Sequence, residues 1–156
     1  MMTLEQISDR LSLQQLVVDY ANAIDERAYD RLDQVFTPDA YIDYRAMGGI
    51  DGAYPKVKAW LPQALAAFPA YMHFVGNFSC VIAGDTATGS TACFNPMEVP
   101  RPPGADGSGG SDVMFLGLWY IDRFVRTPQG WRISERVERK CYNHNMPEWM
   151  RKALQI

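Results

Sequence analysis

The spacing of apolar residues changes once along the chain, near residue 71, and this change restricts the fold more than any other feature. Before it, apolar side chains recur at helical intervals, as they do from Leu4 to Ile24. After it, apolar and polar residues alternate with the period of two that is typical of strands. Helices that precede the strands, instead of alternating with them, indicate an α+β domain whose helices pack on one face of an antiparallel sheet.

The helical part is predicted to contain three helices and one strand. The helices fall at residues 4–24, 29–36 and 53–68, and the strand falls at residues 41–45. Thr3 and Gln6 resemble a capping box at the start of the first helix. Pro38 disfavours a helical Thr37, which ends the second helix. Pro62 predicts a kink or a restart within the third.

The second part is predicted to form two β-hairpins. The first joins residues 72–83 and 86–94 through a Gly-Asp turn, and the second joins residues 112–126 and 131–142. Residues 98–112 between them are rich in proline and glycine, which indicates a loop. This loop lacks the lysine and Ser/Thr of a phosphate-binding loop. We interpret it either as a plain hairpin connection or as a lid over a pocket.

Length and charge restrict the class of protein. A chain of 156 residues suits one domain, from 1 to 156. A net charge of −3 argues against binding to nucleic acid, whose partners usually carry a basic face. No apolar run approaches the ~18 residues of a membrane span, and the start "MMTLEQISDR" does not resemble a signal peptide. We therefore expect a cytoplasmic protein that binds neither nucleic acid nor a membrane.

The cysteines and histidines suggest neither disulfides nor a bound metal. Cys80, Cys93 and Cys141 are odd in number and far apart, which fits reduced thiols in the cytoplasm. Neither they nor the two histidines have the spacing of zinc ligands. Because no dinucleotide-binding motif was found either, we predict a protein without a cofactor.

His73 stands in an otherwise apolar and aromatic run, "AYMHFVGNF" at residues 70–78. A histidine in such a place is either a core group anchored for stability or a general base. The ordinary pKa of an imidazole, about 6.5, suits a base that works near neutral pH. The other histidine, His144, lies among polar residues in "CYNHNMP" and is expected at the surface or at a pocket rim. The residues alone leave both explanations of His73 open.

Several stretches in a fixed order are similar to a known family. They are "YANAIDERAYDRLDQVFTPDAYIDYR", "MHFVGN", "AGDTAT" and "WYIDRFVRTPQGWRI". Together with the order of helices and strands, they resemble the NTF2-like superfamily, in particular its SnoaL-like branch, over about residues 4–140. The resemblance implies a cone-shaped, cystatin-like α+β fold around a deep apolar pocket. It does not determine the activity, because this fold hosts dehydratases, isomerases, cyclases, lyases and non-catalytic proteins.

Two enzyme families within that branch share further residues with this chain. The scytalone dehydratase family resembles it around "YDRL", "IDYR" and "HFVG", and the lindane dehydrochlorinase family around "AIDERAYDRL" and "MHFVGN". Both families use an aspartate at the end of the first helix and a histidine of the first long strand, which fall here on Asp25 and His73. The dehydratase's strand tyrosine falls on Tyr44. A second pocket histidine of the dehydratase is replaced by Met97, so scytalone itself is not the expected substrate.

The resemblance therefore implies a cofactor-independent lyase or dehydratase for a small apolar molecule, aromatic or cyclic. His73 would be the base, Asp25 would orient it, and Tyr44 would donate a hydrogen bond to a developing oxygen anion. The candidates for an apolar pocket lining, although a residue of this kind is more often plain core than pocket wall, are Trp60, Met72, Met97, Met114, Phe115, Trp119 and Tyr120. Asn77 and Asn95 either orient a ligand oxygen or lie at an exposed edge.

Three other functions are compatible with the same pocket. An isomerase would return the proton elsewhere, a C–C lyase of the retro-aldol type would release a carbonyl fragment, and a non-catalytic binding or assembly subunit would need no Asp–His pair. Residues 131–140, "WRISERVERK", alternate in charge along one strand. This pattern predicts a solvated outer face or, more specifically, an ion-paired surface of a homodimer or homotrimer.

Overall fold

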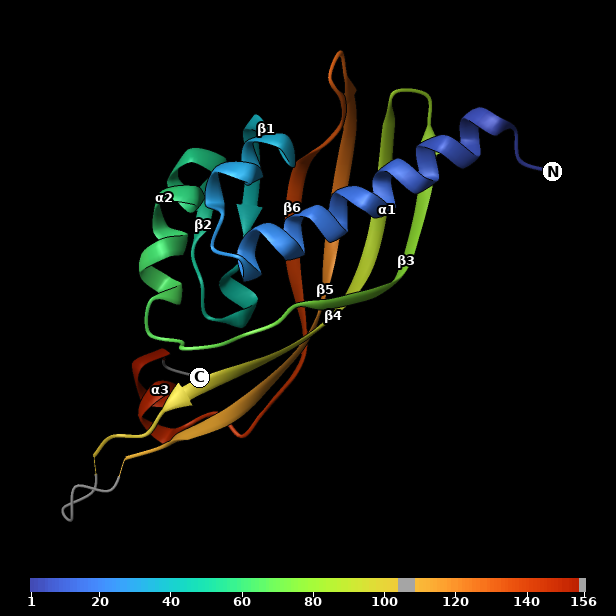
Figure 1. The fold of residues 1–156 in the computed structure, drawn as a ribbon. Helices are drawn as coiled ribbons and strands as arrows, with labels where there is room; N and C mark the ends of the chain where they lie inside the picture. Colours follow the sequence, from blue (N-terminus) through green and yellow to red (C-terminus); the bar gives the residue numbers. More distant parts are fainter. Residues whose placement is uncertain (104–108, 155–156) are drawn as a thin grey trace.

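The computed structural model describes residues 1–103 and 109–154, apart from the side chains of residues 149, 153 and 154. The helices are α1 (Leu4–Asp25), α2 (Tyr54–Leu65) and α3 (Glu148–Leu154), with short 3₁₀ helices η1 (Tyr29–Gln34) and η2 (Arg45–Met47). The strands are β1 (Phe36–Asp43), β2 (Asp51–Ala53), β3 (Phe74–Ala83), β4 (Thr86–Pro100), β5 (Ser111–Thr127) and β6 (Gly130–His144). The predicted α+β class, with helices before the long strands, is confirmed (Figure 1).

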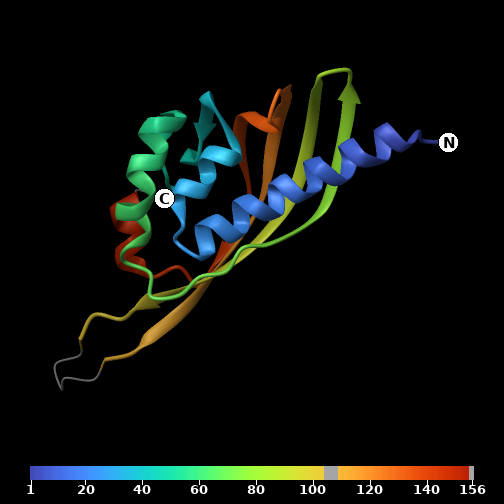
Figure 2. The ribbon, with the colours of Figure 1, turned by 45° about the horizontal axis from the view of Figure 1, so that its top comes forward.

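The strands form one curved, open sheet in the order β2-β1-β6-β5-β4-β3. The two predicted hairpins are present as β3–β4 and β5–β6. The sheet is mixed and not purely antiparallel, because β1 pairs with β6 in parallel. Register shifts interrupt the ladders next to Gly76 and Gly117, and such bulges bend a sheet. Figures 1 and 2 show α1 lying across the resulting concave face, with α2 beside β1 and β2.

Helix α1 begins at the predicted capping box, in which Thr3 and Gln6 exchange hydrogen bonds. Its buried positions face the sheet and form part of the core. Asp9 ties the helix to β5 and β6, because its carboxylate accepts hydrogen bonds from both Nη atoms of Arg126, at 2.8 and 2.7 Å, and from Trp131 Nε1 at 3.0 Å. These bonds lower the pKa of Asp9. The anchor sets the direction of α1 and so the position of Asp25 at its C-terminal end.

Several predicted elements differ in extent. The second helix is the 3₁₀ helix η1, which ends at Gln34, and residues 98–100 and 111–112 of the predicted loop belong to β4 and β5. β1 begins at Phe36, before the predicted strand, and includes Pro38. The proline is accommodated because the β1–β6 ladder is irregular between Phe36 and Tyr41, so no ladder hydrogen bond is required from it. α2 runs through Pro62 without a restart. Residues 104–108 of the predicted lid lie outside the described residues, and no described helix is long and apolar enough to cross a membrane.

The prediction that the charged side chains of residues 131–140 form an outer face is wrong for Glu138, which lines the cavity described below, and for Arg136. This side chain is fully buried on the helix side of the sheet, where it forms a bidentate ion pair with Asp122 of β5 at 2.8 and 2.7 Å. The opposite, outer face of the sheet carries apolar side chains. Those with large exposure near the middle strands are Phe94, Val113, Ile121 and Tyr142.

We expect this outer face to hold a homodimer or homotrimer together, because an exposed apolar patch usually marks an interaction site. Light scattering at micromolar concentration should give the mass of two or three chains. Phe94→Glu should shift the protein towards the monomer, whereas Leu4→Lys, at the exposed start of α1, should not. A monomeric wild-type protein would contradict the expectation.

Candidate active site

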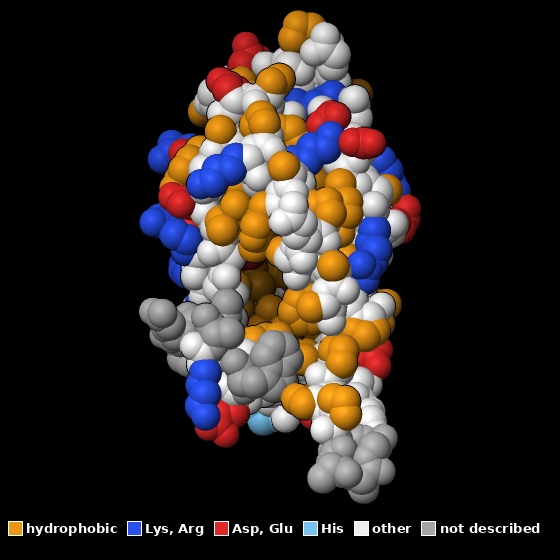
Figure 3. Space-filling model, turned by 90° about the vertical axis from the view of Figure 1, so that its left-hand side faces the viewer, with side chains coloured by type: hydrophobic (Ala, Val, Ile, Leu, Met, Phe, Trp, Pro, Cys, Tyr) orange, Lys and Arg blue, Asp and Glu red, His pale blue; other side chains and the backbone are white. Residues whose placement is uncertain are grey.

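A cavity of about 440 Å³ lies between the concave face of the sheet and the helices. Its lining is mainly apolar and includes Ile24, Trp60, Leu61, Met97, Met114 and Leu116. Met146 and Met150, at the C-terminal end of the described chain, cover one side. Figure 3 shows the molecule hollowed here, with hydrophobic side chains in the depth of the opening. Two wider depressions, of about 940 and 890 Å³, lie elsewhere on the surface and do not include His73.

Asp25 and His73 meet beside this cavity. Asp25 is the last residue of α1, and His73 immediately precedes β3. Asp25 Oδ1 lies 2.6 Å from Nδ1 of His73, and Asp25 Oδ2 accepts a hydrogen bond from the backbone N–H of the same residue at 2.8 Å. The carboxylate thus holds both the ring and the backbone of His73, whose side chain is only 6% exposed. This geometry places a proton on Nδ1 and leaves Nε2 as the acceptor.

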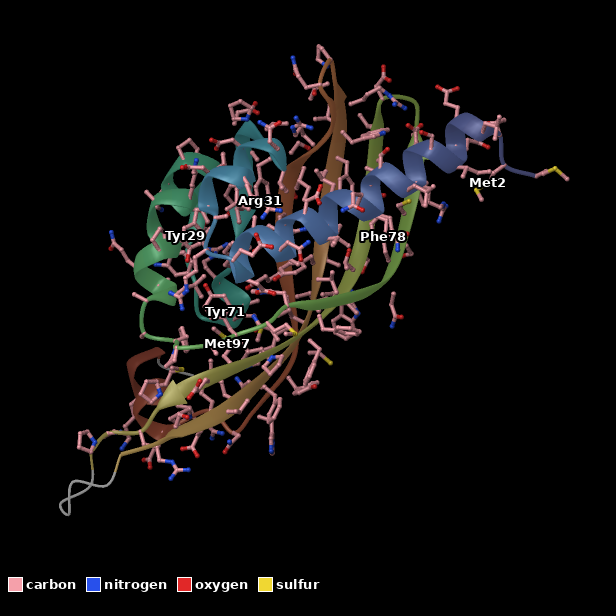
Figure 4. The ribbon with its side chains drawn as sticks, viewed as in Figure 1. Met2, Tyr29, Arg31, Tyr71, Phe78 and Met97 are labelled. Atoms are coloured by element: carbon pink, nitrogen blue, oxygen red, sulfur yellow. The ribbon has the colours of Figure 1, made fainter. Side chains whose placement is uncertain are left out.

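The segment that carries His73 is attached both to the end of α1 and to β4. Tyr71 donates a hydrogen bond to the carbonyl of Ile24 at 3.2 Å and forms an isolated bridge with Met97 of β4. Figure 4 shows Tyr71 and Met97 together near the C-terminal end of α1. The rings of Tyr20 and Tyr71 pack edge-on against the imidazole of His73. The imidazole is therefore held in position before any ligand enters.

Asn95 of β4 completes the surroundings of His73. Its Nδ2 lies 3.0 Å from Nε2 of His73, so the amide donates to the neutral imidazole. Asn95 Oδ1 is buried and has no hydrogen-bond partner among the described residues. Rotation of the amide by half a turn would present Oδ1 to a protonated Nε2 instead. Asn95 can therefore remain hydrogen-bonded to Nε2 of His73 whether the imidazole is neutral or protonated.

Tyr44 points into the same cavity and pairs with Tyr20 of α1. Their hydroxyl oxygens are 2.8 Å apart, and both side chains are buried. Burial raises the pKa of Tyr20 to about 12 and that of Tyr44 well above its ordinary value, so both groups are hydrogen-bond donors at neutral pH. Tyr44 lies in the turn after β1, and Gly49 packs so closely that a Cβ there would be 2.7 Å from the Cβ of Tyr44.

Five of the predicted lining residues do line the cavity: Trp60, Asn95, Met97, Met114 and Tyr120. Phe115 and Trp119 do not, because the even-numbered residues of β5 face the cavity and their odd-numbered neighbours face outward. On that outer face, Phe115 stacks on Phe94, and Arg139 lies over the ring of Trp119.

Met72 and Asn77 also lie outside the cavity lining. Met72 is 62% exposed, since it precedes His73 in an extended segment where successive side chains point to opposite sides. Asn77 has a φ of 49° at the bulge of β3 and is exposed there. An asparagine suits this position because it adopts the left-handed backbone conformation more readily than most residues. His144 is exposed at the end of β6, beside the ring of Phe115, as expected for a surface group.

Three polar residues near the cavity were missed: Tyr20, Arg136 and Glu138. The guanidinium of Arg136 lies between the rings of Tyr20 and Tyr120, 4.1 Å from each ring centre. Glu138 lines the cavity two residues further along β6. Charge alternation in β6 suggested outward side chains, so neither residue was distinguishable from a solvated one. Tyr20 could have been found from its place on the buried face of the first helix, close to Asp25.

The arrangement provides an oriented imidazole and neutral phenols in the lining of one apolar cavity. Such a site can remove a proton and stabilise a developing negative oxygen. Among the residues that the structure describes, no group of three or more histidine, cysteine or acidic side chains is placed to hold a metal ion.

The chain belongs to the SnoaL-like domain family, whose model matches residues 5–137. It is 57% identical over 146 residues to an uncharacterized protein of Mycobacterium tuberculosis, a match that covers 94% of this chain and 95% of the relative.

Two solved structures show the same fold. One is a protein of Novosphingobium aromaticivorans whose assignment as a scytalone dehydratase is provisional; it has a TM-score of 0.78 at 16% identity, covering 94% of this chain and 93% of that one. The other is hexachlorocyclohexane dehydrochlorinase LinA-type3 of Novosphingobium barchaimii, with a TM-score of 0.75 at 17% identity, covering 93% and 94%. The resemblance to the NTF2-like superfamily is thus confirmed at the level of family and fold.

Proposed function

We propose that the protein is a cofactor-independent lyase of the dehydratase type, acting on a small apolar molecule that is aromatic or cyclic. The observation that carries this proposal is the Asp25–His73 pair, with 2.6 Å between Oδ1 and Nδ1 and with His73 among the residues that line the cavity. A volume of about 440 Å³ lies within the ~300–1,000 Å³ that small-molecule sites occupy.

In the proposed reaction, a ligand displaces the Asn95 amide from Nε2 of His73, and Nε2 then takes a proton from carbon or from a hydroxyl group. Asp25 stabilises the imidazolium that forms and keeps the ring in one orientation. Tyr44 donates a hydrogen bond to the oxygen on which negative charge develops. The bond to the leaving group then breaks, and water, halide or a small carbonyl fragment departs. An isomerase would use the same base and return the proton to another carbon.

A second candidate is a non-catalytic ligand-binding subunit. It is favoured by one observation, namely that both ring nitrogens of His73 already have hydrogen-bond partners in Asp25 and Asn95. Such a satisfied histidine also fits a purely structural role in the wall of a binding pocket. The two candidates differ in whether a proton moves.

Deuterium exchange separates them without knowledge of the physiological substrate. The protein would be incubated in D₂O with a panel of cyclic ketones and alcohols, and deuterium incorporation would be followed by mass spectrometry. We expect exchange of an acidic C–H with at least one compound. Asp25→Asn should slow it by about 10²- to 10⁴-fold, because an amide can donate to Nδ1 and so select the wrong tautomer.

Tyr44→Phe is the matched variant, since it removes one hydroxyl and keeps the ring; its effect on exchange should be smaller than that of Asp25→Asn. Melting temperatures of all variants would exclude loss of fold. If no compound exchanges, or if Asp25→Asn exchanges as fast as the wild type, the protein is better explained as a binding subunit.

A further inference from the structure

Glu138 is the only acidic residue among the described residues that line the cavity. It lies on β6, directly across the ladder from Tyr120 of β5. Its Oε2 is buried and has no hydrogen-bond partner among the described residues. A charged carboxylate oxygen without a partner is more costly in such a place than the O–H of a carboxylic acid without an acceptor. The proposed mechanism makes no use of this group so far.

The surroundings of Glu138 favour the acid over the carboxylate. Burial, with a smaller contribution from nearby Asp43, raises the pKa of Glu138 to about 8, even though Arg136 and the backbone of Met47 act in the opposite direction. Arg136 compensates only in part because its own guanidinium is bound by Asp122. The titratable and charged groups near this carboxyl group or across the cavity are Tyr20, Asp43, Tyr44, His73, Cys93, Tyr120 and Arg136.

We propose that Glu138 is a second acid of this cavity, which holds an oxygen atom of the substrate and protonates it as the C–O bond breaks. This inference rests on the proposed function, because it adds a proton donor to the His73 base. It also narrows the substrate class. A carboxylic acid donates strongly to a hydroxyl or carbonyl oxygen, so the ligand carries an oxygen function, and the leaving group is water and not halide.

The step conserves protons and electrons. Nε2 of His73 takes a proton from carbon, and the electron pair of that C–H bond forms the new C=C bond. The C–O bond breaks with its electron pair, and the leaving oxygen takes the proton of Glu138 and departs as water. The imidazolium then loses its proton to solvent and the Glu138 carboxylate regains one, so no oxidant or reductant is required.

The first test needs no substrate. In the unfolded chain Glu138 titrates at its ordinary value of 4.5, and in the fold at about 8, so between these values only the folded state holds the proton. The wild type must therefore lose stability from this group as the pH rises through that range. Glu138→Gln cannot titrate. We expect the melting temperature of Glu138→Gln to rise relative to the wild type between pH 4.5 and 8 and then to stay level.

Glu135→Gln is the matched control, because Glu135 lies on the same strand with its side chain 41% exposed. Its difference from the wild type should not grow over the same pH range. If Glu138→Gln also shows no growing difference, the carboxyl group is ionised in the fold and the proposal is wrong.

The second test uses cyclohexanone and chlorocyclohexane as probes of similar size, with binding followed by NMR. Glu138→Leu should lower the affinity for cyclohexanone by about 2- to 10-fold, the effect of one lost hydrogen bond. It should leave the affinity for chlorocyclohexane unchanged. Above pH 8 the wild type should lose affinity for cyclohexanone, whereas Glu138→Gln should not.

Equal effects on both probes would overturn the role of Glu138. The deuterium-exchange experiment tests the role of His73 as a base independently of Glu138. If exchange depends on Asp25 but neither the stability test nor the binding test shows an effect of Glu138, only the role of Glu138 as an acid is overturned. If both tests show the effect of Glu138 but no compound exchanges, the proton-transfer step is overturned and the lyase proposal is refuted.

Discussion

Replacing His73 by glutamine is expected to lower turnover of any substrate found in the screen by about 10²- to 10⁴-fold. This corresponds to roughly 3–5 kcal/mol in the activation barrier, the usual contribution of a general base. Glutamine can still donate to Asp25 Oδ1, which lies 2.6 Å from Nδ1 in the wild type, so the local fold should persist. Steady-state kinetics and melting temperatures measured on the same preparation check both statements.

His73→Ala tests the opposing explanation, in which the histidine only stabilises the fold. Because the side chain is 6% exposed and bound to Asp25 and Asn95, alanine should lower the melting temperature more than glutamine does. For a structural histidine, folded His73→Ala would keep its specific activity. Activity near the wild-type level in either variant would refute the lyase proposal.

Replacing Arg136 by methionine is expected to reduce the free energy of unfolding by about 3–5 kcal/mol, because it leaves the charge of Asp122 buried without its partner. Both side chains of this pair are almost fully buried, at 0% and 1% exposure. The guanidinium also packs between the rings of Tyr20 and Tyr120, and these contacts would be weakened. Urea unfolding followed by circular dichroism measures the change.

The double variant Arg136→Met with Asp122→Leu separates the buried charge from the packing. If the unpaired carboxylate causes most of the loss, the double variant should recover much of it, since an apolar pair of similar volume can replace a buried ion pair. Arg45→Met breaks the exposed ion pair with Asp43 and should change stability little. Equal effects of Arg45→Met and Arg136→Met would contradict the assignment of Arg136 as a central core group.

Local signals in the sequence were sufficient for most of the fold. The capping box of Thr3 and Gln6, the helical spacing in α1 and the alternation in β3 to β6 act over a few residues, so they can be read without knowledge of the tertiary structure. The parallel pairing of β1 with β6 could not be read in this way. It joins residues about 95 positions apart, such as Tyr41 and Glu135, and no local pattern encodes that contact.

The residues of the candidate site were likewise predicted from the sequence only in part. Asp25, His73 and Tyr44 were expected from stretches that resemble a known family; in the structure His73 and Tyr44 line one cavity, and Asp25 is bonded to His73. The choice between Phe115 and its neighbour Met114 was beyond the sequence, because both faces of β5 are apolar there. When both faces are apolar, alternation no longer shows which residues point inward, and only the packing of the helices decides.

Residues 131–140 show most clearly what the sequence determined and what it did not. Their alternation of charged and apolar residues determined that the segment is a strand, because a period of two is a local property of the backbone. The tertiary structure alone decided that Arg136 and Glu138 face inward. Asp122 opposite Arg136, and a cavity beside Glu138, come from distant parts of the chain and make it possible to bury these groups.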